Sequence, residues 1–393
     1  MKTHSLSRIA GALVVALGLS TSVISTDVLA NTTTSAIKGQ IAGPQGNPAP
    51  GTKITITHVP SGTTKTATVN NAGIFVAQGL RVGGPYTVVI DSDKFEDATV
   101  SDIFLTLGET YPMSVDLNVQ QNLETIVVTG RPLSMHAGGS GPSTHFSAND
   151  LKNAPSINRD LKDIVRIDPR IYIDESRSGA IQCGGGSPRF NSLTVDGVRM
   201  NDSFGLNDNG YPTTRIPFSY DSIDQVSVEL APFDVKYGGF TACNINAVTK
   251  SGTNEIHGSV FIDYTNDSMK GDTIEGVDQD NGSYSEKRYG FNLGMPLIQD
   301  ELFLFMSYEK LDGEELFSYS PFGDNVSQAD LDRVIQITRD VYNYEAGGTP
   351  AGLPVEDEKI LVKLDWNISE DHRASFIYNY NDGFKLDQSD DWG

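Results

Sequence analysis

The most regular pattern of apolar and polar positions lies in the last third of the chain, from His257 onward. Apolar and polar side chains alternate there, which is typical of β-strands. We expect five strands, at residues 259–264, 289–295, 301–310, 359–368 and 373–380. Two connections are short and two are long and polar, in alternation along the chain. This asymmetry is typical of a membrane β-barrel with periplasmic turns and extracellular loops, and a water-soluble sandwich does not need it.

Five strands are too few to close a barrel, because the smallest bacterial barrels have about eight. We therefore expect residues 257–393 to be the first strands of an incomplete transmembrane antiparallel β-barrel, truncated at Gly393.

Residues 31–120 carry a different pattern, in which short strand signals alternate with glycine and proline turns. About seven strands in ninety residues predict a small β-sandwich. The clearest strand signals are at Ala36–Ile41, Lys53–His58, Thr64–Val69, Ile74–Ala77, Tyr86–Asp91 and Met113–Val119.

Residues 121–145 read as a polar, glycine-rich linker with one unusual segment, ETIVVTG at Glu124–Gly130. Its five consecutive β-branched residues have a strong strand propensity. One interpretation is the last strand of the sandwich. The other is an unpaired strand that is held ready to add to the sheet of another protein.

Residues 146–256 predict a compact α/β unit. Asn158–Arg166 has helical spacing, and Asp196-Gly197 is a hairpin turn signal between two short strands. Ile223–Leu230 and Asn244–Val248 are further strands. The chain as a whole is therefore expected to be mainly β.

The first thirty residues predict a secretory signal peptide rather than structure. Lys2 and Arg8 precede the apolar stretch Ile9–Leu19, and Val28–Ala30 offers a cleavage site. The alternative, a membrane anchor, needs about 20 apolar residues, and this stretch is shorter.

Charge and cysteine content fit an exported protein. The formal charge of -22 argues against a nucleic-acid partner, which needs a basic face. Cys183 and Cys243 would meet in an oxidising compartment, where a disulfide is expected. It would close a loop of about sixty residues and stabilise the fold by about 4 kcal/mol. The alternative is two unpaired thiols.

The sequence offers no candidate catalytic residues, metal site or cofactor site. It shows no nucleophile and base in a recognisable arrangement, no metal-ligand spacing and no phosphate-binding loop, so a secreted enzyme is not expected. The acidic segment Asp272–Asn281 lacks the spaced ligands of a calcium loop and is interpreted as a solvated loop.

Several motifs resemble those of TonB-dependent outer-membrane receptors with an N-terminal carboxypeptidase regulatory-like domain, the Oar-like subgroup. Gly39, Asn71–Phe75 and Leu80–Tyr86 resemble the regulatory-like domain. Leu161–Ile171 resembles an early motif of the plug domain, with Asp168-Pro169-Arg170 where that family usually has P-G-V. The other similar segments are Phe190–Val198, Ile223–Leu230 with Lys236–Gly239, and the plug-to-barrel junction Ile245–Ser259.

This resemblance implies gated, energised uptake by a protein of the Gram-negative outer membrane, with the N-terminal domain in the periplasm and lipid around the barrel. The linker segment would be a TonB box that binds TonB, itself driven by an inner-membrane complex, through Glu124, Thr125, Ile126, Val127, Val128, Thr129 and Gly130. An unknown extracellular ligand would bind at the plug apex, through Asn201, Asp202, Phe204, Asn207, Asp208 and Tyr211. The alternative for this stretch is an ordinary solvated loop. The alternative function is an adhesin or surface-display protein without transport.

Overall fold

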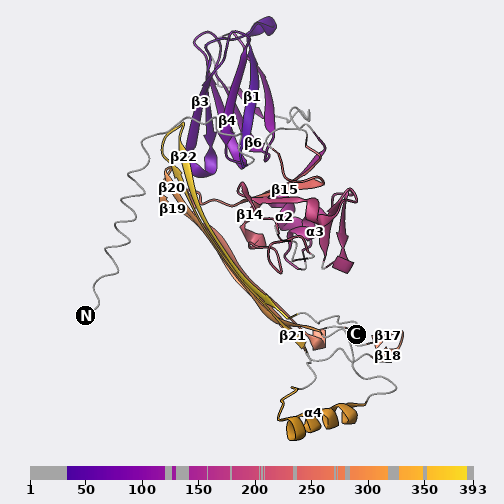
Figure 1. Cartoon of the computed structure of the whole chain (residues 1–393). Helices are drawn as coiled ribbons and strands as arrows, with labels where there is room; N and C mark the ends of the chain where they lie inside the picture. Colours follow the sequence, from indigo (N-terminus) through magenta and orange to yellow (C-terminus); the bar gives the residue numbers. More distant parts are fainter. Residues whose placement is uncertain are drawn as a thin grey trace, which may run out of the picture. The chain divides into compact units, whose positions relative to one another are not determined.

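The structure is a computed structural model, drawn in Figure 1 and coloured along the sequence. The expected signal peptide lies outside the residues that it describes. The described residues are 33–119, 126–129, 141–156, 158–177, 179–202, 204, 207, 209–232, 237–269, 271, 273–278, 284–316, 327–347 and 352–386. Within these ranges, no helix is both long and apolar enough to cross a membrane.

The first part is the expected β-sandwich of two sheets. In one sheet β1 (Ser35–Ala42) lies between β4 (Ile74–Leu80) and β7 (Thr110–Asp116). The other has the order β3 (Thr63–Thr68), β2 (Lys53–His58), β5 (Gly83–Asp91), β6 (Ala98–Leu105) and β8 (Ile126–Thr129). The core includes Ile37, Ile41, Ile54, Ile56, Phe75, Val88, Ile90, Ile103 and Leu105, none of them more than 2% exposed.

The second part is the α/β unit, built on a mixed sheet with a buried centre. The sheet order is β13 (Val198–Arg199), β12 (Ser192–Val195), β15 (Cys243–Thr249), β14 (Ile223–Leu230) and β9 (Ser143–Phe146). Helix α2 (Ala148–Asn153) begins at Ser147, which forms a capping box with Asp150. The other elements are α3 (Leu161–Val165) and a hairpin of β10 (Ile171–Asp174) and β11 (Ala180–Cys183).

The third part is a five-stranded antiparallel sheet whose order follows the chain. Its strands are β16 (His257–Asn266), β19 (Ser285–Ile298), β20 (Leu302–Leu316), β21 (Gly352–Asn367) and β22 (Arg373–Lys385). The predicted strands are confirmed, although most are longer than the sequence pattern indicates, at up to 16 residues. In the described structure this sheet is open, with β16 and β22 at its edges.

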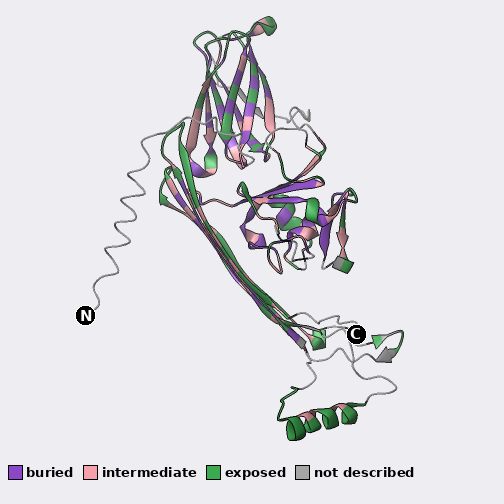
Figure 2. Ribbon diagram, viewed as in Figure 1, coloured by how far each residue is buried: buried purple, intermediate pink, exposed green. Residues whose placement is uncertain are grey.

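The two faces of this sheet differ as the alternation predicts, and Figure 2 shows their burial. On β21, Asp357, Lys359, Leu361, Lys363 and Asp365 are buried on one face. The opposite face carries exposed apolar side chains on several strands, including Val260 at 84%, Ile262 at 69%, Phe376 at 62% and Trp366 at 46% exposure. An apolar outer face and a polar inner face are characteristic of a membrane barrel.

The connections between these strands keep the predicted asymmetry. Only three residues separate β19 from β20, and five separate β21 from β22. The long β16–β19 connection holds β17 (Thr273–Ile274) and β18 (Val277–Asp278), and the long β20–β21 connection holds α4 (Gln328–Tyr342), which the sequence pattern did not predict. The described residues also form 3-10 turns at Pro44–Gly46, Val59–Ser61, Glu175–Arg177, Pro188–Phe190, Tyr220–Ser222 and Asp267–Met269.

Candidate functional site: the α/β unit and its contacts with the five-stranded sheet

A tight hairpin turn presents Asp196 at the end of the α/β unit. Asp196 and Gly197 both have positive φ, 48° and 81°, as a type I′ turn requires. The Asp196 carboxylate accepts hydrogen bonds from the backbone N–H of Thr249 at 3.0 Å and from its hydroxyl at 2.6 Å. The hairpin is therefore fixed to the end of the neighbouring strand β15.

Lys363, on the inner face of the barrel sheet, binds this hairpin. Its Nζ donates to the carbonyl of Thr249 at 2.9 Å and to its hydroxyl at 3.3 Å, and forms an ion pair with Asp196 at 3.4 Å. The side chains of Lys363 and Asp196 are only 7% and 6% exposed. We refer to Asp196, Thr249 and Lys363 as the Lys363 cluster. A charge buried this deeply is tolerable only while its partners stay in place.

The charges of Lys363 and Asp196 also act on the carboxyl group of Asp224. Burial raises its pKa to about 6, while Lys363 and Lys250 lower the pKa and Asp196 raises it. A buried carboxyl group with a pKa of about 6 therefore lies beside the Lys363 cluster.

Other inner-face side chains also reach the α/β unit. The hydroxyl of Ser219 donates to Glu309 at 2.8 Å, and Arg288 donates to the carbonyl of Asn158 at 2.6 Å. Asn379 donates to the carbonyl of Pro217 at 3.1 Å. With Lys363, these contacts come from four neighbouring strands, β19 to β22, and each is a hydrogen bond or an ion pair.

Glu309 is held within the barrel sheet as well. Its second carboxylate oxygen pairs with Lys359 at 3.3 Å, and Lys359 pairs with Asp357 at 3.0 Å. These inner-face charges were visible in the sequence as the polar positions of alternating strands. Their partners on the α/β unit were not, because nothing in the sequence links Lys363 to Asp196 across 167 positions.

The residues expected to bind ligand are not brought together as a set. Asn201 has its own partners within the hairpin: its amide oxygen accepts from Leu193 N–H at 3.1 Å, and its amide nitrogen donates to Asn191 at 2.7 Å. Asp202 accepts the N–H groups of Phe204 and Asn207 at 3.0 and 2.8 Å, and so shapes its own loop. Asp208 lies outside the described residues.

The two aromatic residues of that set differ sharply. Phe204 is 88% exposed and can meet a ligand. Tyr211 is 2% exposed, and its hydroxyl donates to Asp160 at 2.8 Å. Burial and the nearby Asp160 carboxylate raise the pKa of Tyr211 well above its usual value. Tyr211 is thus a core residue, and the expectation that it contacts a ligand was wrong for this arrangement, because its hydroxyl already has a buried partner.

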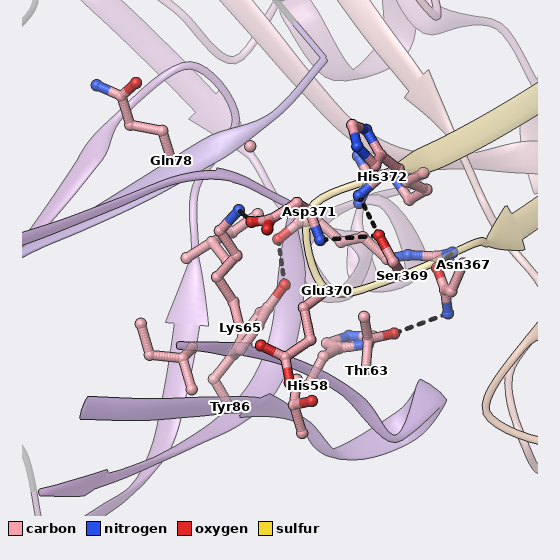
Figure 3. A pocket seen from close by; sticks show the side chains of 16 residues that line it. His58, Thr63, Lys65, Gln78, Tyr86, Asn367, Ser369, Glu370, Asp371 and His372 are labelled. Atoms are coloured by element: carbon pink, nitrogen blue, oxygen red, sulfur yellow. Dashed lines mark hydrogen bonds and ion pairs between the residues drawn. The ribbon is translucent and has the colours of Figure 1, made fainter. Parts of the chain in front are cut away.

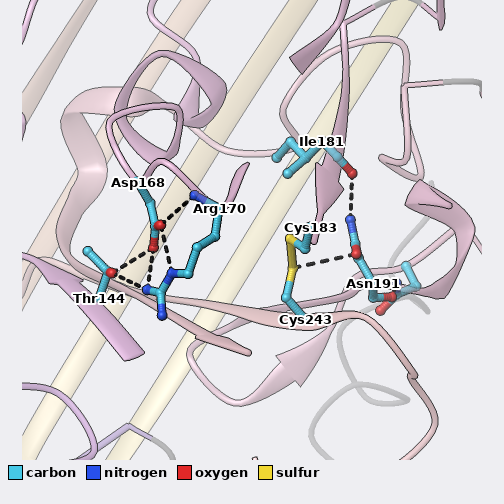
Figure 4. Close-up of a disulfide and its surroundings, with 8 residues drawn as sticks. Thr144, Asp168, Arg170, Ile181, Cys183, Asn191 and Cys243 are labelled. Carbon is cyan, nitrogen blue, oxygen red and sulfur yellow. Dashed lines mark hydrogen bonds and ion pairs between the residues drawn. A yellow bond between two sulfur atoms is a disulfide. The ribbon is translucent and has the colours of Figure 1, made fainter. Parts of the chain in front are cut away.

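The two cysteines are bonded in the structure, as Figure 4 shows. The sulfur atoms of Cys183 and Cys243 are 2.04 Å apart and join residues separated by 60 positions. The bond connects the β10–β11 hairpin to β15, and both cysteines are buried. Asn191 lies beside it and donates to the carbonyl of Ile181 at 2.7 Å, which holds the start of β12 against the same hairpin.

Figure 4 also shows how the unusual Asp168-Pro169-Arg170 sequence forms its turn. The Arg170 guanidinium binds both oxygens of Asp168, at 2.8 and 2.6 Å, and also donates to Thr144 on β9 at 2.7 Å. The hydrogen bonds from Arg170 hold the pKa of Asp168 well below its usual range. We refer to Thr144, Asp168 and Arg170 as the β9 clamp.

The ETIVVTG segment is not an unpaired strand where it is described. Ile126–Thr129 form β8, which pairs in parallel with β6 of the sandwich. Glu124, Thr125 and Gly130 lie outside the described residues. Of the two interpretations of this segment, the structure has the sandwich strand.

A small cavity of about 120 Å³ lies between the sandwich and the β21–β22 turn, and Figure 3 shows its lining. Lys65 pairs with Asp371 at 3.1 Å, and Asn367 donates to Thr63 at 3.0 Å. Burial, and then Arg81 and Arg373, lower the pKa of His58 in its wall to about 3, so that this ring is neutral. The cavity is a polar seam between two parts of the chain.

The acidic loop from Asp272 to Asn281 is described only in part, at residues 273–278, where β17 and β18 pair. Among the described residues, no group of three or more histidine, cysteine, aspartate or glutamate side chains is arranged to hold a metal ion.

Two family models match the chain. Residues 36–118 match the carboxypeptidase regulatory-like domain, and residues 248–343 match an outer membrane beta barrel domain. The chain is 25% identical to the TonB-dependent transporter Oar of Myxococcus xanthus, over 75% of this chain and 28% of that protein. The chain is therefore similar to TonB-dependent outer-membrane receptors, in its N-terminal domain and in its first barrel strands.

One further curated protein and one solved structure are also similar to the chain. A probable TonB-dependent siderophore receptor, PirA of Acinetobacter baumannii, is 30% identical over 49% of this chain and 26% of its own length. The solved outer-membrane transporter YddB of Escherichia coli has a TM-score of 0.47 at 15% identity, with 64% of this chain and 35% of that chain covered. The chain thus spans about a quarter of the length of the curated relatives it matches. No catalytic family is among these matches, and the barrel domain places the receptor in the outer membrane.

Proposed function

We propose that this receptor takes up an external ligand across the outer membrane, with residues 146–256 as a plug that a TonB-driven pull releases. The observation that carries the proposal is the way in which the plug is held. Its contacts with Arg288, Glu309, Lys363 and Asn379 are hydrogen bonds and ion pairs. Water can replace such partners when the plug moves, so these particular contacts can be broken at a modest cost.

The proposed handle for the pull is the TonB box at Glu124–Gly130. Its β-branched residues favour an extended backbone, and it contains no proline that would remove a strand hydrogen bond. TonB would bind it by adding it to a sheet, where backbone groups supply the affinity. The inner-membrane complex that energises TonB would supply the force.

The proposed ligand surface is the loop around Phe204, with Asp202 and Asn207 beside it. Phe204 is an exposed apolar group in the described part of this loop, and aromatic side chains are common anchors in binding sites. The probable siderophore receptor among the relatives makes a ferric siderophore the first ligand to test.

Uptake assays in a deletion strain test this function. The strain is grown on iron-poor medium with single ferric siderophores, then with other nutrients as sole sources, with and without the wild-type gene on a plasmid. We expect the gene to restore growth on at least one nutrient only when TonB is present. Restored growth without TonB would refute energised uptake. If the gene changes cell attachment but no nutrient response, the adhesin alternative replaces this proposal.

A further inference from the structure

Strand β8 occupies one edge of the sandwich sheet. Ala98, Thr99, Val100 and Ser101 of β6 pair in parallel with Ile126, Val127, Val128 and Thr129, in that order. The other edge of β6 pairs antiparallel with β5. Four of the seven residues of the proposed TonB box are thus bound as a strand within the receptor itself.

The described pairing reaches Ser101, and the backbone of β6 changes direction at the next residue. The next residue, Asp102, has a positive φ of 59°, and the β5–β6 register shifts at this point. A β-bulge bends a strand and interrupts its ladder of hydrogen bonds. Four residues at the start of β6 are therefore available as a straight edge, and four residues of the box fill it.

The preceding residues of the chain place the start of the linker close to this edge of β6. Val119 forms an isolated β-bridge with Phe95, and Glu96 N–H donates to Asn118 at 3.1 Å, just ahead of β6. Six residues, 120–125, then separate Val119 from β8. A tether this short gives the box an effective concentration on the order of millimolar at the β6 edge.

We infer that the β6 edge of the regulatory-like domain is a docking site for the receptor's own TonB box, so that TonB and β6 compete for the same strand. The inference rests on the proposed function for the identity of the box. Because β8 is the last strand of its sheet, the competition requires TonB to pair with the same edge of the box that β6 occupies. The experiment below tests this requirement directly. Where the docked form outnumbers the free form by about ten to one, the apparent affinity for TonB falls about tenfold.

A cysteine cross-link tests the docking directly. Thr99→Cys with Val127→Cys joins an in-register pair on strands about 4.8 Å apart, within the reach of a disulfide. The matched control, Thr99→Cys with Thr129→Cys, keeps the first cysteine and shifts the second by two positions, to about 8 Å. The receptor is expressed from its own gene, purified in detergent without ligand, and oxidised briefly.

We expect the in-register pair to cross-link at least tenfold faster than the control. Equal rates would overturn the docking, whether or not the receptor transports anything, because this readout does not involve TonB. Purified TonB C-terminal domain is then titrated onto the cross-linked receptor. We expect binding at least tenfold weaker than to the unoxidised variant and to the oxidised wild type. Unchanged binding to a fully cross-linked receptor would overturn the competition.

Discussion

Replacing Lys363 with methionine tests one contact between the proposed plug and the barrel strands, the one that buries an ion pair. Lys363→Met keeps most of the side-chain length and removes the charge, the ion pair with Asp196 and two hydrogen bonds to Thr249. Asp196 keeps its two donors on Thr249, so the variant does not leave the Asp196 carboxylate without partners. The loss is then close to that of a charged hydrogen bond, about 2 kcal/mol.

Hydrogen exchange measures this loss where it occurs. A drop of about 2 kcal/mol in the local opening free energy speeds exchange about 30-fold. We expect this acceleration at residues 192–199 and 243–249 of the receptor in detergent, detected by mass spectrometry. Lys310→Met is the matched control, because Lys310 lies on the neighbouring strand with its side chain on the outer face. That variant should leave plug exchange unchanged.

A double-mutant cycle excludes the main objection, which is that an apolar replacement of a buried pair is sometimes neutral. Asp196→Asn, Lys363→Met and the double variant give the coupling energy of the two side chains. We expect about 1–3 kcal/mol for residues in direct contact. A coupling near zero, with exchange in Lys363→Met within twofold of wild type, would refute the idea that this cluster holds the plug.

Three further predictions concern the box, the disulfide and the buried carboxyl group. Val127→Pro should abolish TonB-dependent uptake and leave ligand binding intact, since proline removes a backbone donor. Met135→Pro in the same linker is the control. Unchanged transport in Val127→Pro would contradict the assignment of the box. Cys183→Ser with Cys243→Ser should lower plug stability by about 4 kcal/mol, given the 60-residue separation, and an unshifted denaturation midpoint would contradict this. Asp224 has a folded pKa of about 6, above its unfolded value of about 3.9, so its stabilising contribution is complete below pH 4 and is lost as the pH rises through 6. Asp224→Asn should therefore flatten the pH dependence of unfolding between pH 4 and 6 and make the plug more stable than wild type at pH 7; parallel curves would rule this out.

The alternation of apolar and polar positions predicted the strands in which it runs without interruption. β2 and β14 occur at the residues that alternation gave, and the barrel strands differ from the prediction mainly in length. β6 was missed because its bulge at Asp102 breaks the alternation: the buried positions are Ala98 and Val100, then Ile103 and Leu105. A search for strict alternation does not detect a strand whose buried positions shift by one residue at a bulge.

The candidate site was harder to predict, because its side chains depend on partners far away in the chain. Tyr211 lies in a polar stretch that reads as a loop, but Asp160 binds its hydroxyl in the core. Lys363 looks like any inward-facing lysine until the Asp196 hairpin is placed against it. Local sequence gives the residue type and the face, and only the tertiary fold gives the partner.

The β9 clamp and the Cys183–Cys243 bond would resist a pull on the linker at different points of the plug. Force that enters through the proposed TonB box reaches β9 first, and β9 pairs with β14 through only four residues. The β9 clamp reinforces this edge, because Arg170 and Asp168 both hold Thr144. Beyond it, the Cys183–Cys243 bond keeps the β10–β11 hairpin on β15 at any force that leaves covalent bonds intact. A pull can thus peel β9 and break the Lys363 cluster while the disulfide-bonded centre of the plug stays folded, which favours partial displacement of the plug over its complete unfolding.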